Sequence, residues 1–360
     1  MCSEMRLATV EATPNIAVVK YWGKRDEELM LPNNGSLSFT MDETLKTRTT
    51  LAFSPEFKED EAWINGEKLD EKALKKVIKA LDAVREAAGT SEKAKLVSIN
   101  GFPTAAGMAS SASGMAALAC AANEVLGLGL DSKGLSILAR RGSGSACRSV
   151  LGGFVEWRRG EKEDGSDSYA IQVTDENHWP EIRNVIAVVD HGEKKVSSRA
   201  GMKQTIETSP LYSARQQYLP KVIEDVKAAV LAKDFNKFGE LVMRESNDLH
   251  SVMLDTWPPI LYLNDVSKEI IYAVHEYNEN AGKIVAAYTF DAGPNAHVYT
   301  TEDQVKGIKE MLSKIKGIQK TVVCKVGAGP KKLSDGHLIA EDGSVKKHHY
   351  DAEKNGIVVE

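Results

Sequence analysis

Apolar residues recur along the chain with the two periods that separate strands from helices. Alternating or β-branched runs predict strands. We expect strands over 6–19, 36–41, 46–53, 95–100, 182–189, 284–290, 298–300 and 321–326. The first of these should be interrupted at Pro14-Asn15, because proline cannot donate to a strand ladder. Residues 62–67 should form a hairpin with Asn65-Gly66 at its tip.

Helical spacing is clearest over residues 71–88, where apolar residues recur on one face and Gly89 follows as a stop signal. Further helices are expected over 115–122, 132–141, 205–237 with Pro220 as a helix start, 238–250, 260–282 and 302–315. This mixture predicts an α+β protein. The pattern changes near Asp190, so we expect two lobes, 1–190 and 191–360. The polar tail from Lys331 is expected to be a surface extension.

Composition excludes several classes of protein. The 360 residues are 42% hydrophobic and 27% charged, as in an ordinary soluble protein. A net charge of -5 argues against a general nucleic-acid or membrane binder. There is no apolar run of about 18 residues and no signal-like N-terminus, which predicts a cytosolic protein. The four cysteines lack C-x-x-C spacing, which makes a zinc site or a disulfide framework unexpected.

A Gly/Ser-rich loop, 101–114, leads directly into an Ala-rich helix. Small residues let backbone N–H groups approach a ligand, and the helix N-terminus adds its positive dipole end, a geometry that binds phosphate. No Gly-Lys-Ser/Thr follows, so this is not a Walker A loop. The alternative is a tight turn before a buried helix, in which the small residues serve only packing.

Three further segments carry candidate chemistry. Residues 20–26 gather three cations and two aromatics around a glycine, which fits an anion clamp or a charged loop over tucked aromatics. Arg148 stands in a second Gly/Ser segment and suits a carboxylate ligand, the alternative being a structural Asp or Glu partner. Asp291 follows a predicted strand and precedes a Gly-Pro turn, a place for function or for a turn-initiating Asp.

Five segments, taken together and in order, form a distinctive set. They are Pro14-Asn-Ile-Ala, Lys20-Tyr-Trp-Gly-Lys, Pro103-Thr-Ala-Ala-Gly-Met-Ala-Ser-Ser-Ala, Gly142-Ser-Gly-Ser-Ala-Cys-Arg-Ser and Phe290-Asp-Ala-Gly-Pro-Asn-Ala. The set resembles the mevalonate diphosphate decarboxylase family of the GHMP kinase superfamily. The resemblance runs from about Ala8 to Pro330. The departures from the family pattern are Gly35, Met108, Ser113 and His297.

The resemblance implies a fold and a reaction. The fold would be a GHMP kinase fold, with an N-terminal lobe of the ribosomal S5 domain 2-like type and a ferredoxin-like C-terminal lobe. The active site would lie in the cleft between them. The reaction would be ATP- and Mg²⁺-dependent decarboxylation of mevalonate 5-diphosphate to isopentenyl diphosphate. The resemblance also implies a homodimer, with a small-molecule substrate and neither nucleic acid nor membrane as a partner.

The resemblance also assigns roles at the reacting end of the substrate. Asp291 would position or deprotonate the 3-hydroxyl group that accepts the γ-phosphoryl group. Arg148, assisted by Ser143 and Ser145, would hold the C1 carboxylate. Asn15 and Lys20 would line the reacting end.

Other residues would bind the phosphates. The substrate diphosphate would be held by Tyr21, Lys24, Ser198 and Arg199. The ATP phosphates would be cradled by Pro103, Ala106, Gly107, Met108, Ala109, Ser110 and Ser111, with Ser111 also on Mg²⁺.

Three other functions fit the same residues less fully. The nearest is a decarboxylase of mevalonate 5-phosphate, and the next is a GHMP kinase of another small alcohol that releases no CO2. Arg148 in its Gly/Ser frame argues against a plain kinase. The third is a catalytically silent GHMP-like binding protein, and the joint presence of Asp291, Arg148, Lys20 and Lys24 argues against it.

Overall fold

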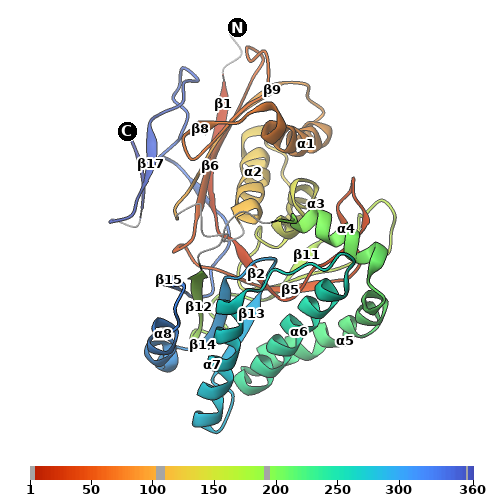
Figure 1. Ribbon diagram of the computed structural model, residues 1–360. Coiled ribbons are helices and arrows are strands. Elements are labelled where there is room, and N and C mark those ends of the chain that lie inside the picture. The colour runs from red at the N-terminus through yellow and green to blue at the C-terminus, as the bar shows by residue number, and fades with distance from the viewer. Residues whose placement is uncertain (1–4, 103–109, 190–194, 354–355) are drawn as a thin grey trace.

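The computed structural model describes residues 5–102, 110–189, 195–353 and 356–360. Within these ranges the strands form one six-stranded sheet, two four-stranded sheets and two short pairs. Figure 1 shows the six-stranded sheet at one end of the molecule and helices α5, α6 and α7 at the other. The α+β class expected from the sequence is confirmed.

The six-stranded sheet has the order β16-β1-β6-β9-β7-β8. Its strands are β1 (Arg6–Ala12), β6 (Thr47–Ser54), β7 (Glu61–Ile64), β8 (Glu67–Lys68), β9 (Lys93–Asn100) and β16 (Lys331–Leu333). The helices packed on one face are α1 (Glu71–Ala88), α2 (Ser110–Leu126) and α3 (Ser132–Gly142). Helix α1 has its predicted ends, because Asp70 accepts from the Ala73 amide and Gly89 adopts φ 62° at the C-cap.

A four-stranded sheet, β11-β10-β5-β2, leads from the first sheet toward the second half of the chain. Its strands are β2 (Asn15–Val19), β5 (Ser36–Thr40), β10 (Phe154–Trp157) and β11 (Ala170–Thr174). The predicted interruption at Pro14 is confirmed, and it sends β1 and β2 into different sheets. Short elements nearby are the strand pair β3 (Lys24–Asp26) and β4 (Leu31–Pro32) and the 3-10 helix η2 (Gly144–Cys147).

The third sheet is antiparallel with the order β13-β14-β12-β15. Its strands are β12 (Ile182–Val189), β13 (Ala286–Phe290), β14 (Ala296–Thr301) and β15 (Ile318–Cys324). Helices connect β12 to β13 and β14 to β15, and this β-α-β-β-α-β order is ferredoxin-like, as expected. Because β12 is its first strand, we propose to move the expected lobe boundary from residue 190 to just before Ile182.

The helices of this half are α4 (Ser198–Thr208), α5 (Leu211–Ala232), α6 (Phe235–Asp255), α7 (Asp265–Ala281) and α8 (Val305–Ser313), which follows the 3-10 helix η3 (Glu302–Gln304). The expected helix start at Pro220 is wrong, since Pro220 lies inside α5 and its neighbour Leu219 is buried in the core. The burial of this face of α5 outweighs the cost of the helical hydrogen bond that proline cannot donate. Helix α7 begins later than expected because Asn264 caps it. No helix in the described ranges is long and apolar enough to cross a membrane.

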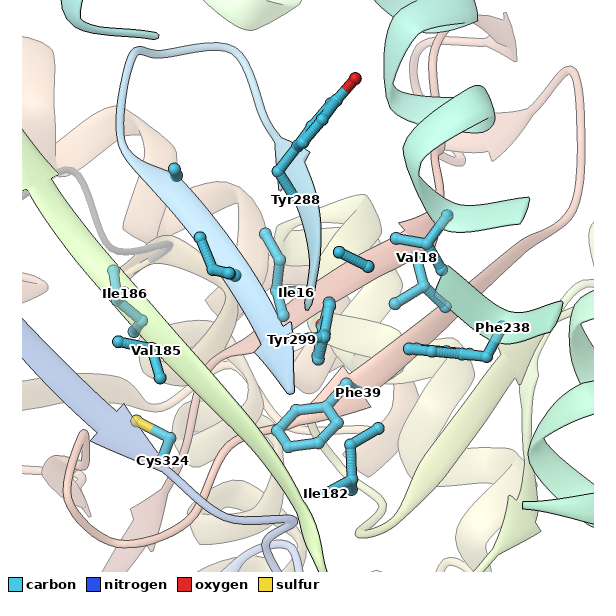
Figure 2. Packing of buried hydrophobic residues seen from close by; sticks show 14 of the residues in the cluster. Ile16, Val18, Phe39, Ile182, Val185, Ile186, Phe238, Tyr288, Tyr299 and Cys324 are labelled. Atoms are coloured by element: carbon cyan, nitrogen blue, oxygen red, sulfur yellow. The ribbon is translucent and has the colours of Figure 1, made fainter. Parts of the chain in front are cut away.

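The largest hydrophobic core joins the two halves of the chain. It includes Ile16 of β2, Phe39 of β5, Val185 of β12, Phe238 of α6 and Tyr299 of β14 (Figure 2). The rings of Phe39 and Tyr299 meet at a centroid distance of 5.3 Å, and those of Phe238 and Tyr299 at 5.5 Å. This shared core fixes the two four-stranded sheets relative to each other.

The C-terminal tail is not the surface extension expected from its polar sequence. Strand β16 pairs with β1, and Leu338 and Ile339 are buried against Ala52, Val97 and Ile99 on the sheet face opposite α2. The tail ends in the strand pair β17 (His348–Asp351) and β18 (Gly356–Val359). Two adjacent apolar residues in a polar segment gave too weak a signal for this packing.

Shortening Leu338 should destabilise the fold although it lies far along the tail. Leu338→Ala should lower the free energy of unfolding by about 2–5 kcal/mol, because it removes a fully buried side chain. Urea unfolding measures the change. The control Leu261→Ala, at a leucine that is 71% exposed, should stay within about 0.5 kcal/mol of the parent protein. Equal stability of the two variants would mean that the tail does not pack on the sheet in solution.

Candidate active site

A cavity of ≈ 450 Å³ lies where the ends of β2 and β13 meet η2 and α4. Most of the site residues predicted from the sequence line it. They are Lys20, Tyr21, Lys24, Ser111, Ser143, Ser145, Arg148, Ser198, Arg199 and Asp291. Segments separated by up to 271 residues in sequence therefore meet in one place.

Lys20 and Asp291 form an ion pair in the wall of this cavity. The Lys20 ammonium donates to Asp291 Oδ1 at 2.7 Å. The lysine side chain is 2% exposed, whereas the aspartate side chain is 48% exposed and opens into the cavity. Removal from bulk water on its own raises the pKa of Asp291, but the Lys20 charge outweighs this effect and holds the pKa below its ordinary value. Asp291 is therefore a carboxylate at neutral pH.

Two histidines adjoin the pair, and neither has a role predicted from the sequence. His297 of β14 lines the cavity, and its Nδ1 lies 3.0 Å from the amide nitrogen of Asn184. Burial lowers its pKa to about 4. Burial, assisted by the Lys20 charge, also lowers the pKa of His250 of α6 to about 4. Both rings are neutral at pH 7, so neither histidine adds a positive charge beside the carboxylate.

Arg148 follows η2 and is 3% exposed. Its Nε donates to Asn15 Oδ1 at 3.0 Å, and a terminal nitrogen donates to Ser36 Oγ at 2.7 Å. Its guanidinium lies 5.9 Å from the centre of the Trp157 ring, which is fully buried. Among the described residues no Asp or Glu forms a salt bridge with Arg148, so the alternative of a structural ion pair is not supported there.

Asn15 stands behind Arg148 and is not among the residues that line the cavity. Its amide nitrogen donates to the Ser145 carbonyl at 3.0 Å and to Ser149 Oγ at 2.7 Å, while its oxygen accepts from Arg148. The residue thus links the start of β2 to the Gly/Ser segment and holds the arginine in place. We retain it as a proposed site residue that acts by positioning Arg148.

The other end of the cavity holds the predicted anion-binding residues. Tyr21 stacks against Trp157 with ring centroids 4.8 Å apart, and its buried hydroxyl has no hydrogen-bond partner within the part of the chain described. Lys24 donates to Glu27 at 2.6 Å, and burial lowers its pKa in spite of that bond. Ser198 and Arg199 begin α4 and face these residues from the second half of the chain. Two sides of the cavity therefore carry donors.

The predicted phosphate loop falls largely outside the described residues. This applies to Pro103, Ala106, Gly107, Met108 and Ala109, and to the side chain of Ser110. Helix α2 starts at Ser110, and Ser111 in its first turn lines the cavity. The described part thus brings a helix N-terminus to the cavity, as the phosphate-binding hypothesis requires.

This arrangement combines a carboxylate, a buried arginine without an acidic partner in the described chain, and a helix N-terminus. A carboxylate can accept a hydroxyl proton, an arginine can bind a substrate carboxylate, and a helix N-terminus can bind phosphate. The described residues contain no group of three or more His, Cys, Asp or Glu suited to a metal ion.

Two family models together match most of the chain. The diphosphomevalonate decarboxylase-like N-terminal domain matches residues 12–170, and the mevalonate 5-diphosphate decarboxylase C-terminal domain matches residues 184–332. A diphosphomevalonate decarboxylase from Ganoderma lucidum is 46% identical over 325 residues, covering 85% of this chain and 81% of the relative.

Solved structures agree with these matches. The mevalonate diphosphate decarboxylase from Staphylococcus aureus is 37% identical with a TM-score of 0.86, covering 92% of this chain and 98% of its own. A structure described as "MDDEF in complex with MVAPP, AMPPCP and Magnesium" is 40% identical with a TM-score of 0.86, covering 92% of this chain and 100% of its own.

The ferredoxin-like unit, the shared core and the cavity between the sheets define a two-lobed enzyme fold of the GHMP kinase type. Within that class, the extent of the matches is decisive because they span both lobes at 37–46% identity. The chain belongs to the diphosphomevalonate decarboxylase family.

Replacing Arg148 by lysine should be damaging although it keeps the charge. Lysine cannot bond Asn15 and Ser36 and also present a planar fork to a ligand carboxylate. Loss of one or two charge-assisted hydrogen bonds, at about 1.5–3 kcal/mol each, should lower kcat/KM for decarboxylation at least about tenfold. Steady-state assays of CO2 release measure this loss.

Arg140→Lys is the matched control. Arg140 is 1% exposed and bonds only carbonyls of Leu29, Gly165 and Ser168, outside the cavity lining. It should lower the melting temperature and leave kcat/KM of the folded fraction near the parent value. If Arg148→Lys behaved in the same way, Arg148 would be a structural residue only.

Proposed function

We propose that the protein catalyses the ATP-dependent decarboxylation of mevalonate 5-diphosphate to isopentenyl diphosphate, with release of ADP, phosphate and CO2. The observation that carries the proposal is the position of Arg148 in the same cavity as the Lys20–Asp291 pair. A phosphoryl-transfer site needs the carboxylate, but a plain kinase of a neutral alcohol has no use for a buried guanidinium without an acidic partner in the described chain.

ATP and Mg²⁺ fit the described residues. Ser111 in the first turn of α2 offers a hydroxyl to the cavity, and the helix N-terminus favours phosphate. The related structure described above contains AMPPCP and magnesium. Ser111 would hold Mg²⁺ together with phosphate oxygens, and the ion would neutralise charge on the phosphates during transfer. The loop that includes Gly107 and Ala109 would complete the cradle.

Asp291 would act on the 3-hydroxyl group of the substrate. As a carboxylate it accepts the hydrogen bond of that hydroxyl, orients the oxygen toward the γ-phosphoryl group and takes up its proton as the new O–P bond forms. The proximity of Lys20 keeps Asp291 ionised but also weakens it as a base. Its contribution is therefore largely one of orientation, with proton uptake late in the transfer.

Arg148 would act in the second half of the reaction. When the phosphate leaves, its C–O bond electrons depart with it and the tertiary carbon becomes electron-deficient. The C1–C2 bond electrons then form the new double bond, and C1 leaves as CO2. Arg148 with Ser143 and Ser145 would hold the carboxylate in line for this step. No residue needs to form a covalent intermediate.

The diphosphate would occupy the end of the cavity lined by Tyr21, Lys24, Ser198 and Arg199. The Tyr21 hydroxyl would gain the partner that the described chain does not provide. Donors on both sides of the cavity favour a diphosphate over a monophosphate. We also propose a homodimer, as the family resemblance implies, and a cytosolic location, as expected from the sequence.

Incubation of the protein with ATP, Mg²⁺ and mevalonate 5-diphosphate tests the reaction. ADP and CO2 should appear in equal amounts, whereas ADP without CO2 would identify a kinase. Asp291→Asn keeps the shape of the side chain and removes its ability to take a proton, so kcat should fall about 10²–10⁴-fold with the substrate KM little changed. Near-parental kcat in folded Asp291→Asn protein would contradict the role given to Asp291.

The length of the phosphate tail is tested with two substrates. We expect kcat/KM for the 5-diphosphate to exceed that for the 5-monophosphate by about two decades, because a shorter tail loses charge-assisted contacts. Arg199→Ala should narrow this gap by lowering kcat/KM for the 5-diphosphate. Lys203→Ala removes a 72%-exposed cation from the same helix and should leave the gap unchanged. A parent protein that prefers the monophosphate would overturn the proposed substrate.

A further inference from the structure

Helix α6 holds both chain segments that carry the ion pair. The Lys20 amide donates to Glu245 Oε1 at 3.0 Å, and the Phe290 amide, one residue before Asp291, donates to Ser246 Oγ at 3.0 Å. Glu245 and Ser246 are neighbours on α6. Two consecutive residues of α6 therefore bond the main chain at Lys20 and at the residue before Asp291.

No strand ladder joins the two held segments. Lys20 follows β2 and Asp291 follows β13, and these strands belong to different sheets. Both residues lie just beyond a strand end, where ladder hydrogen bonds no longer fix the backbone. A direct ion pair of 2.7 Å needs both backbones to be placed closely, and α6 is one rigid element that reaches both.

The holding residues are buried in a way that packing alone does not require. Glu245 is 4% exposed and Ser246 is 1% exposed. Glu245 pairs with Arg215 of α5, which is 1% exposed and also contacts Asp248. A buried ion pair is weak evidence for stability, since apolar residues of similar volume often stabilise a fold equally well. The position of this buried pair beside Lys20 points to a geometric role.

The Lys20 backbone is held on its other side as well. Asn34 donates its side-chain amide to the Lys20 carbonyl at 2.9 Å. Both main-chain polar groups of Lys20 are thus bonded by side chains, Glu245 on one side and Asn34 on the other. The lysine enters the cavity from a backbone that cannot easily rotate.

We propose that Glu245 and Ser246 are positioning residues of the decarboxylation reaction, which set the separation between Lys20 and Asp291. The inference rests on the proposed function for its kinetic consequence and on the contacts above for its geometry. Neither residue lines the cavity, so neither is expected to touch substrate. Their effect passes through the orientation of the ion pair.

The pH dependence of kcat reports this geometry. The charged and titratable groups that interact with Asp291 are Lys20, Arg148, His250, His297 and Tyr299. Lys20 is the charge that lowers the pKa of Asp291 most strongly. If the pair is loosened, the pKa of Asp291 rises and its carboxylate is protonated at a higher pH. The acidic limb of the pH profile of kcat then shifts to higher pH.

Ser246→Ala is the principal test. It removes the acceptor of the Phe290 amide, and kcat should fall about 10- to 100-fold, as expected when reacting groups are displaced by about 1 Å. The KM for the mevalonate substrate should change less, and the acidic limb should shift to higher pH. Ser246→Thr retains a hydroxyl and should restore most of kcat.

Thr50→Val is the matched control. Thr50 is fully buried in the first sheet and does not line the cavity; its hydroxyl accepts from the Leu338 amide at 2.8 Å and also bonds the Thr9 hydroxyl at 2.7 Å. It removes the same kind of hydrogen bond and should lower stability without altering kcat or the pH profile. If Ser246→Ala and Thr50→Val both lower stability alone, the positioning role is overturned.

A second measurement does not depend on activity. The coupling between Lys20→Met and Asp291→Asn, obtained from urea unfolding of the single and double variants, reports the strength of the ion pair. This coupling should shrink in the Ser246→Ala background and persist in the Thr50→Val background. An unchanged coupling would overturn the proposal. A parent protein that releases neither ADP nor CO2 would refute the proposed function, and the unfolding cycle would then decide the positioning role by itself.

Discussion

The Lys20–Asp291 ion pair sets the conditions for every other feature of the site. The carboxylate opens into a cavity, and a buried cation 2.7 Å away holds its pKa below the ordinary value. The neutral state of His250 and His297 follows from burial next to that cation. Arg148 can then remain the cation that awaits a ligand carboxylate, because Asp291 is already neutralised by Lys20. Lys20 is thus paired with Asp291, and Arg148 is left to bind the carboxylate of the ligand.

The arrangement of these charged side chains depends on the rigidity of the hydrophobic core beneath the site. The two four-stranded sheets share one hydrophobic cluster, in which Phe39, Phe238 and Tyr299 meet edge to face. Aromatic pairs of this kind have preferred geometries and resist sliding. A cleft between independently moving lobes could not keep Lys20 and Asp291 in contact. The cavity is better described as a fixed seam between the two sheets, with Ser111 of α2 and Ser198 and Arg199 of α4 on its other sides.

Much of the fold and part of the site could be predicted from the sequence. Strands with strong patterns, such as β12, and helix α1 with its two caps were found with correct ends. The predicted break at Pro220 failed because local propensity is outweighed by the burial of Leu219. Residues in contiguous motifs, such as Arg148 and Asp291, could be identified. Glu245 could not, since its role depends on an amide 225 residues away and no local pattern encodes that distance.

The pairing of β16 with β1 has a consequence for how the protein is made. Strand β16, Lys331–Leu333, lies in the last tenth of the given sequence and must pair with a strand that begins at Arg6. During synthesis β1 therefore leaves the ribosome with one edge unpaired and waits for nearly the whole chain. An unpaired edge is open to association with other chains. The first lobe can therefore close this edge only after residues 331–333 have been synthesised.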